Sequence, residues 1–219
     1  MRRIFACLIF LCSTSAVAGF IPFGVQNDVA QSTITDDWQW RLCHSSNYQS
    51  SVSIADLFNE CNGDYVMLGA GLSSATSLSV AAAALYSDVT QYTSWNETHL
   101  ANGAQWYFNA YSMGFAGEGD TIYQQTADVE GLDETDRMSW HTRLVEDSWA
   151  QDATQSPLYV YNGWRVGDES WIYEGTDWNR YIYTYSSSSA IAVSEPASFG
   201  LFLVALGFIV VRRKQLPSY

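Results

Sequence analysis

Lysine is almost missing from this chain of 219 residues, and its only lysine, Lys214, lies close to the C-terminus. Between residues 19 and 193 the chain has five arginines and no lysine, against 22 aspartates and glutamates. A body this acidic repels phosphate backbones and anionic lipid headgroups. We therefore expect no nucleic-acid partner, whereas cations and uncharged partners such as sugars stay open.

The chain also has none of the sequence motifs of common hydrolases. It contains no G-x-S-x-G, no H-E-x-x-H and no phosphate-binding glycine loop. The glycine-rich stretch at Gly69 and Gly71 lacks a lysine and is interpreted as a turn, and His99 and His141 are interpreted as structural residues. The sequence assigns no catalytic residue, but carboxylate pairs are set in space and stay open.

The N-terminus has the order of a secretory signal peptide. Two arginines precede a nine-residue apolar run, residues 4–12, and small residues follow at 16–18. Nine apolar residues are far below the roughly 20 that a membrane-spanning helix needs. We predict a signal peptide at residues 1–18, cleaved before Gly19, and hence an exported protein.

Cysteine is scarce in the exported part of the chain. Two of the four cysteines lie in the predicted signal peptide, so that only Cys43 and Cys61 remain. A single pair in an oxidising compartment favours a disulfide over a metal site. The bridge would close a loop of about 18 residues and stabilise the fold by roughly 3 kcal/mol in the chain-entropy model.

A second apolar segment lies near the C-terminus, at residues 199–211. We predict a short transmembrane helix here, joined to the body by a Ser-rich linker at residues 186–193. Even an apolar helix of about 15 residues reaches only about 22 Å, against a hydrocarbon core of roughly 30 Å. The basic cluster that follows should act as a stop-transfer signal and keep the C-terminus in the cytoplasm: Arg212, Arg213 and Lys214.

The residues before this segment, Ser194, Glu195 and Pro196, complete a three-part signal. With its short Glu-Pro motif, short apolar helix and basic stop, the stretch from Val193 to Gln215 resembles the PEP-CTERM sorting domain of Gram-negative bacteria. This chain has Ser194 where that family has its first proline. The resemblance implies that residues 194–215 are recognised by an exosortase, a membrane protease-transpeptidase, which processes the chain near the Glu-Pro motif.

Such a sorting signal implies a precursor anchored in the inner membrane. After processing, the body would be released or attached at the cell surface or in the extracellular matrix, often beside exopolysaccharide. An ordinary single-pass anchor is the alternative interpretation of the same residues.

The body, residues 19–185, has the length of one domain. Its frequent turn signals and its aromatic and β-branched residues predict a mainly β fold, a single antiparallel sheet or sandwich. Two Asn-Gly pairs, at 102–103 and 162–163, predict hairpins with type I′ turns. A third hairpin is predicted between residues 171–173 and 180–185. One short helix is predicted after Ser53, because Ser53 and Asp56 have the spacing of a capping box.

Two features of the body suggest a ligand. The acidic run from Asp128 to Asp136 offers oxygen ligands that suit Ca²⁺, but it lacks the EF-hand spacing, so we interpret it as a solvated acidic loop and expect no cofactor. The many aromatic residues suit either core packing or stacking on sugars, and three tryptophans in polar segments are the candidates for stacking: Trp164, Trp171 and Trp178.

Two functions from different classes fit these observations. The first is an exported surface or matrix protein with a binding or structural body that is not an enzyme, whose ligand would be polysaccharide. The second is a secreted carbohydrate-active enzyme that uses a pair of carboxylates. A shallow, aromatic surface would favour the first, and two close carboxylates in a deep pocket would favour the second.

Overall fold

The computed structural model describes residues 19–94, 97–120, 122, 135–148, 150–163, 165–170, 172 and 177–187. These residues belong to one compact unit, Gly19–Ser187. The predicted signal peptide, the linker beyond residue 187, the sorting residues and the predicted transmembrane helix lie outside the described residues. So do Trp164 and Trp171, and the acidic run up to residue 134.

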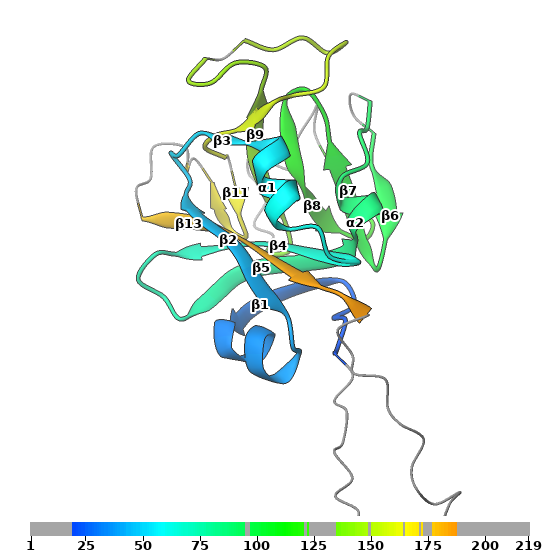
Figure 1. Ribbon diagram of the computed structural model, residues 1–219, viewed down its shortest axis with the longest axis vertical. Helices are drawn as coiled ribbons and strands as arrows, with labels where there is room; N and C mark the ends of the chain where they lie inside the picture. Colours follow the sequence, from blue (N-terminus) through cyan, green and yellow to red (C-terminus); the bar gives the residue numbers. More distant parts are fainter. Residues whose placement is uncertain are drawn as a thin grey trace, which may run out of the picture. The chain divides into compact units, whose positions relative to one another are not determined.

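The described residues form mainly antiparallel strands with few helices (Figure 1), so the prediction of a mainly β chain is confirmed. One sheet has five strands in the order β1-β5-β4-β13-β2. Its strands are β1 (Val25–Ala30), β2 (Arg41–Asn47), β4 (Tyr65–Leu72), β5 (Ser77–Leu85) and β13 (Trp178–Tyr185). A π-helical segment, η1 (Thr33–Asp37), lies between β1 and β2 in the chain.

The second sheet has eight strands, six of them in the order β12-β11-β9-β8-β7-β6. β10 pairs with both β9 and β3. The strands are β3 (Val52–Ser53), β6 (His99–Ala101), β7 (Ala104–Phe108), β8 (Ser112–Gly117), β9 (Met138–Arg143), β10 (Tyr159–Val160), β11 (Arg165–Val166) and β12 (Glu169–Ser170). Two short helices follow strands, α1 (Ile54–Glu60) after β3 and α2 (Tyr86–Val89) after β5.

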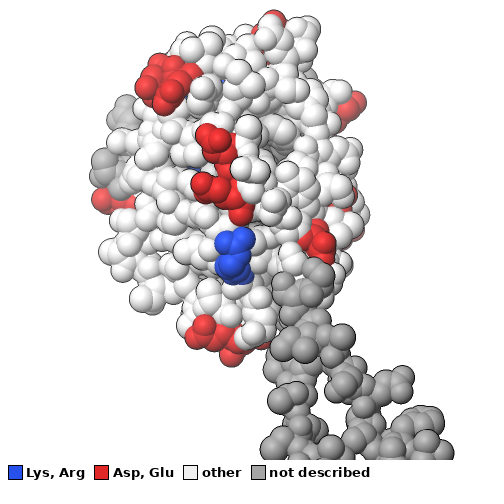
Figure 2. Space-filling view, viewed as in Figure 1, with Lys and Arg blue, Asp and Glu red and all other residues white. Residues whose placement is uncertain are grey.

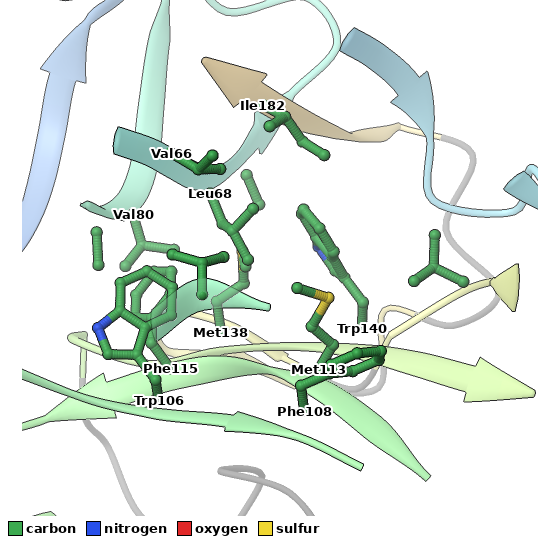
Figure 3. Close-up of a cluster of buried hydrophobic side chains, with 14 of the residues drawn as sticks. Val66, Leu68, Val80, Trp106, Phe108, Met113, Phe115, Met138, Trp140 and Ile182 are labelled. Atoms are coloured by element: carbon green, nitrogen blue, oxygen red, sulfur yellow. The ribbon is translucent and has the colours of Figure 1, made fainter. Parts of the chain in front are cut away.

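The two sheets share one buried core, to which each contributes a different kind of side chain. The five-stranded sheet supplies aliphatic residues such as Val66, Leu68 and Ile182, while the eight-stranded sheet supplies large rings such as Trp106 and Trp140 (Figure 3). All five are at most 1% exposed. Alternation along each strand places these residues on the shared face.

The helix α1 forms as the sequence predicts. The Ser53 hydroxyl accepts a hydrogen bond from the backbone N–H of Asp56 at 3.3 Å, which caps the first turn. Leu57 and Phe58 are buried on the inner side of the helix, which ends at Glu60.

The hairpin at Asn102 and Gly103 is confirmed. β6 pairs with β7, and the two turn residues have φ values of 49° and 75°, as a type I′ turn requires. The Asn102 side chain also donates to the carbonyl oxygens of Pro22 and Ala83, at 2.7 and 2.8 Å, so that the turn is fixed to the other sheet.

The hairpin predicted at Asn162 and Gly163 is wrong. β10 and β11, on either side of this pair, both lie against β9 and not against each other. The register changes between them, since Tyr159 is paired with Arg143 but Arg165 with Ser139. The chain therefore runs along β9 with a local bulge at the Asn-Gly pair.

The third predicted hairpin is also wrong. β13 is flanked by β4 on one side and β2 on the other, over almost its whole length. Both edges of β13 are thus occupied by β4 and β2, while Trp171 and Tyr173 of the predicted hairpin lie outside the described residues.

The glycine-rich stretch is not a turn, because Gly69 and Gly71 lie inside β4. A Cβ on Gly71 would lie 2.8 Å from the carbonyl oxygen of Ser77 and 3.2 Å from the Cα of Leu78. The glycine allows β5 to approach β4 closely, which is the physical reason for a glycine in this strand.

The two ends of the compact unit lie next to each other. The backbone nitrogen of Gly19 donates to the hydroxyl of Tyr185, at the end of β13, at 3.2 Å. The chain therefore enters and leaves the described unit at the same place.

Candidate functional site

Positive and negative charges are distributed in opposite ways in the described unit. Four of its five arginines are at most 2% exposed: Arg137, Arg143, Arg165 and Arg180. Arg41 is the one exposed arginine among the described residues. No aspartate or glutamate whose side chain the structure describes is buried. The surface is consequently acidic, with basic atoms gathered mostly at one place in the view of Figure 2.

Arg180 is fully buried, on β13, and its hydrogen-bond partners are mostly backbone carbonyls. Its guanidinium donates to the carbonyl oxygens of Tyr48 at 2.6 Å and Ser50 at 2.8 Å. Burial lowers the pKa of Arg180 to about 10, so the group remains charged at neutral pH. A buried cation held by carbonyl groups ties β13 to the chain after β2, and we assign it a structural role.

His141, on β9, lies close to this charge. Burial, together with the charges of Arg143 and Arg180, lowers the pKa of His141 to about 3. The imidazole is therefore neutral throughout the physiological range and does not act as an acid–base catalyst near neutral pH. This agrees with the interpretation of His141 as a structural residue.

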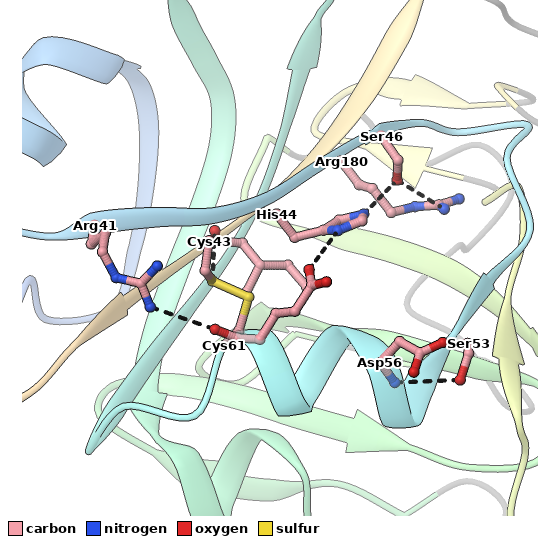
Figure 4. A network of polar contacts seen from close by, with 10 residues as sticks. Arg41, Cys43, His44, Ser46, Ser53, Asp56, Cys61 and Arg180 are labelled. Atoms are coloured by element: carbon pink, nitrogen blue, oxygen red, sulfur yellow. Dashed lines mark hydrogen bonds and ion pairs between the residues drawn. A yellow bond between two sulfur atoms is a disulfide. The ribbon is translucent and has the colours of Figure 1, made fainter.

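The predicted disulfide is confirmed. Cys43, on β2, is bonded to Cys61, which directly follows α1, with the two Cα atoms 5.4 Å apart (Figure 4). His44 lies beside this bond, with its Nδ1 3.8 Å from a carboxylate oxygen of Glu60. The bridge fixes the end of α1 to the edge of the five-stranded sheet.

Four carboxylates line two hollows on the side of β1. The hollows have volumes of about 490 and 440 Å³, and both are lined by Asn27, Thr135 and Asp168. Other acidic side chains line them as well, namely Asp28, Glu118 and Asp136. We call this region the acidic groove.

Two carboxylates at the acidic groove are in direct contact. Asp136 is hydrogen-bonded to Asp120, and Asp120 forms an ion pair with Arg137 at 3.3 Å. Partial burial, together with the charge of Asp120 and this hydrogen bond, raises the pKa of Asp136. Gly117 makes room for the pair, because a Cβ there would collide with the Asp136 carboxylate.

This pair does not have the geometry of a glycosidase. The two carboxyl groups of a retaining enzyme lie roughly 5 Å apart and those of an inverting enzyme roughly 6.5–9.5 Å apart, with the sugar or water between them. Two groups in hydrogen-bond contact leave no such space. The chemistry that the pair can perform is to share a proton or a cation.

Of the three candidate stacking tryptophans, the structure describes Trp178. This residue lies on β13, half-buried, packs against the core and lines the acidic groove beside Asp168. The structure does not bring it together with an exposed aromatic strip among the described residues, and its stacking role stays a prediction.

A third hollow lies on the side of α1 and α2 and has a volume of about 460 Å³. Its lining is aromatic and polar but uncharged: Ile54, Ala55, Phe58, Asn59, Asn62, Tyr86, Thr90 and Phe108. We call it the amide hollow. The sequence did not predict it, because its residues come from three separate segments and form no local motif.

The described part of the chain has neither a metal-binding cluster nor a membrane-spanning helix. No group of three or more His, Cys, Asp or Glu side chains is placed to hold a metal ion there. None of the helices there is both long and apolar enough to span a membrane. No family model, curated protein or solved structure matches this chain.

Proposed function

We propose that this protein is an exported bacterial surface or extracellular-matrix protein, sorted through its PEP-CTERM-like signal, with a body that binds polysaccharide and is not an enzyme. The observation that carries the proposal is the charge distribution of the body, with arginines inside and carboxylates outside. A lysine-free acidic surface repels anionic partners and stays soluble and hydrated. Hydrated, uncharged polysaccharide is the kind of matrix that such a surface tolerates.

Two further observations support the proposal. The Cys43–Cys61 disulfide fits an oxidising compartment outside the cytoplasm. The described unit also begins and ends at one place, so that an N-terminal leader and a C-terminal tether would be attached on the same side. The contact between Asp120 and Asp136 argues against the alternative, a glycosidase that uses this carboxylate pair.

The sorting part of the proposal is tested at the C-terminus of the mature protein. The full chain is expressed in a strain with an exosortase, and the C-terminus of the surface form is determined by mass spectrometry. We expect a chain that ends near Glu195 and Pro196, and replacement of both residues by alanine should leave a cell-bound chain that extends to Tyr219. An intact Tyr219 on the wild-type surface protein would leave only the plain-anchor interpretation.

The replacement has a matched control in the basic cluster. Since proline disfavours helix at the residue before it, Glu195 should be extended and accessible to a protease. The basic residues should instead fix the orientation of the membrane segment, so their replacement by alanine should weaken membrane retention rather than block processing.

The binding part is tested with the mature protein on a polysaccharide panel, with binding and release of reducing ends followed together. Binding without hydrolysis is expected. Hydrolysis that is lost in an Asp136→Asn variant would support the enzyme alternative instead.

A further inference from the structure

The amide hollow is formed by two short helices and the end of a strand. Phe58 and Asn59 come from α1, Asn62 follows its end, Tyr86 begins α2, and Phe108 ends β7. Its volume of about 460 Å³ lies within the range of small-molecule sites.

Three aromatic residues line this hollow: Phe58, Tyr86 and Phe108. Phe58 and Tyr86 pack edge to face with their ring centroids 6.0 Å apart, and Phe108 packs in the same way against Tyr92, also at 6.0 Å. Phe58 and Phe108 are almost buried, Tyr86 is half-buried and Tyr92 is 40% exposed. Fixed rings with exposed parts offer an apolar surface that loses little conformational entropy when a ligand binds.

Polar groups that make no hydrogen bond to the described residues line the hollow as well. The side-chain amides of Asn59 and Asn62 are exposed and make no hydrogen bond to the described residues, and neither does the Tyr86 hydroxyl. The hydroxyl of Thr90, in contrast, donates to the Tyr86 carbonyl oxygen at 2.8 Å. The two amides each supply donors and an acceptor, the pattern that vicinal hydroxyl groups can complete.

The charge of the hollow selects among ligands. No charged side chain lines it, whereas three or more carboxylates line the acidic groove. A ligand with a carboxylate or a phosphate would find no cation here and would approach a surface of like charge. A ligand with both hydroxyl groups and an apolar C–H face matches the amides and the rings together.

We propose that the amide hollow is a binding site for one or two units of an uncharged saccharide. Asn59, Asn62 and the Tyr86 hydroxyl hydrogen-bond the sugar hydroxyls, and the Tyr86 ring packs against the sugar face. This inference rests on the proposed function, because it names the site and the ligand class of the polysaccharide-binding body.

The disulfide positions this site. Asn59 and Asn62 flank Cys61, whose bond to Cys43 holds the end of α1 against β2. Both amides therefore depend on the oxidised form for their placement, although neither cysteine lines the hollow.

The test uses the mature protein, purified from a host that exports the full chain. Its affinity is measured by calorimetry for neutral hexasaccharides of glucan, mannan, xylan and galactan, with oligogalacturonide of the same length as the anionic counterpart. The wild-type protein should bind at least one neutral probe and bind the oligogalacturonide more weakly.

Three variants locate the binding. The Asn59→Ala, Asn62→Ala double variant should bind about 10-fold more weakly, and Tyr86→Phe about 3-fold more weakly, since each lost hydrogen bond has a modest net value. Gln151→Ala, an exposed amide outside all three hollows, is the matched control and should bind as the wild type does. Both asparagines are exposed and unbonded, so thermal unfolding should not change.

The possible outcomes separate the two proposals. Wild-type binding that the double variant retains would overturn the inference and leave the proposed function standing. A wild-type protein that binds none of the neutral probes would overturn both. Stronger binding of oligogalacturonide than of every neutral probe would overturn the uncharged ligand class.

Discussion

The two sheets fill the core between them in different ways. The five-stranded sheet contributes small or aliphatic residues, with glycines in β4 and a run of alanines in β5, and its strands are long. The eight-stranded sheet contributes large rings, has shorter strands, and also holds two of the four buried arginines, Arg143 and Arg165. Small residues let strands and sheets approach closely, while large ones fill the space with few residues. Stability should therefore depend unequally on single residues of the two sheets.

The largest effect is expected from a truncation on the aromatic side. Trp140, on β9, is fully buried and donates through its indole N–H to the Tyr48 hydroxyl at 2.9 Å. Trp140→Ala should lower the free energy of unfolding by about 4 kcal/mol, whereas Val80→Ala on β5 should cost about 2 kcal/mol. Urea unfolding of both variants checks this, and equal losses would contradict the difference between the sheets.

The disulfide is the covalent link between the two regions, since β2 belongs to the five-stranded sheet and α1 follows β3 of the other. Replacing both Cys43 and Cys61 by alanine should lower the free energy of unfolding by about 3 kcal/mol. Thiol titration of the unfolded, unreduced wild-type protein is the control. Two free thiols per chain would show that the bond is not formed in the purified protein.

We expect acid to destabilise the protein through His141, which lies in the eight-stranded sheet. In the unfolded chain His141 takes up a proton near its ordinary pKa of 6.5, but in the folded protein only near pH 3. Because the unfolded state binds the proton first, stability is complete above pH 6.5 and is lost as the pH falls toward 3.

This loss should amount to about 2 kcal/mol between pH 7 and pH 5, at about 1.4 kcal/mol for each unit of pKa difference. Chemical unfolding at the two pH values measures it. The His141→Gln variant should show a flatter dependence, and an unchanged slope in that variant would assign the acid sensitivity to other groups.

The smallest effect is expected at the acidic groove. Asp136→Asn removes the repulsion between Asp136 and Asp120, so it should stabilise the fold by less than about 1 kcal/mol at pH 7, since the pair is partly exposed. The gain should vanish at acidic pH, where Asp136 is protonated in the wild type. Destabilisation by this variant at pH 7 would mean that the pair holds a bound cation.

The sequence predicted those features of the fold that involve residues close together in the chain, and it failed for features that involve distant residues. The cap of α1 and the hairpin at Asn102 involve neighbours in the chain, and both formed as predicted. The hairpin predicted at the second Asn-Gly pair did not form, because the backbone of Asn162 has distant partners. The Asn162 N–H donates to the Tyr48 carbonyl oxygen at 2.6 Å, and the Asn162 carbonyl oxygen accepts from Arg180. Tertiary pairing with β9 replaced the local turn.

The candidate sites were less predictable than the fold. Cys43 and Cys61 are the only two cysteines after the predicted signal peptide, so each has one possible partner. The disulfide could therefore be predicted from composition alone. The contact of Asp136 with Asp120, and the common hollow that Asn62 and Phe108 line, arise from the tertiary arrangement, which no spacing in the sequence encodes. The glycines of β4 were wrongly predicted to form a turn. They are needed because β5 approaches β4 closely, and this contact is not visible in the sequence around the glycines.

The position of β13 has a mechanical consequence. The described chain leaves the unit from the end of this strand, which is hydrogen-bonded on both sides to β4 and β2. A force that pulls on the C-terminal segment is directed along the strand, so it loads both ladders of hydrogen bonds together in shear rather than opening them one at a time. If the chain is held at a surface by its C-terminus, flow or movement of the surroundings would act on a strand that is paired on both sides.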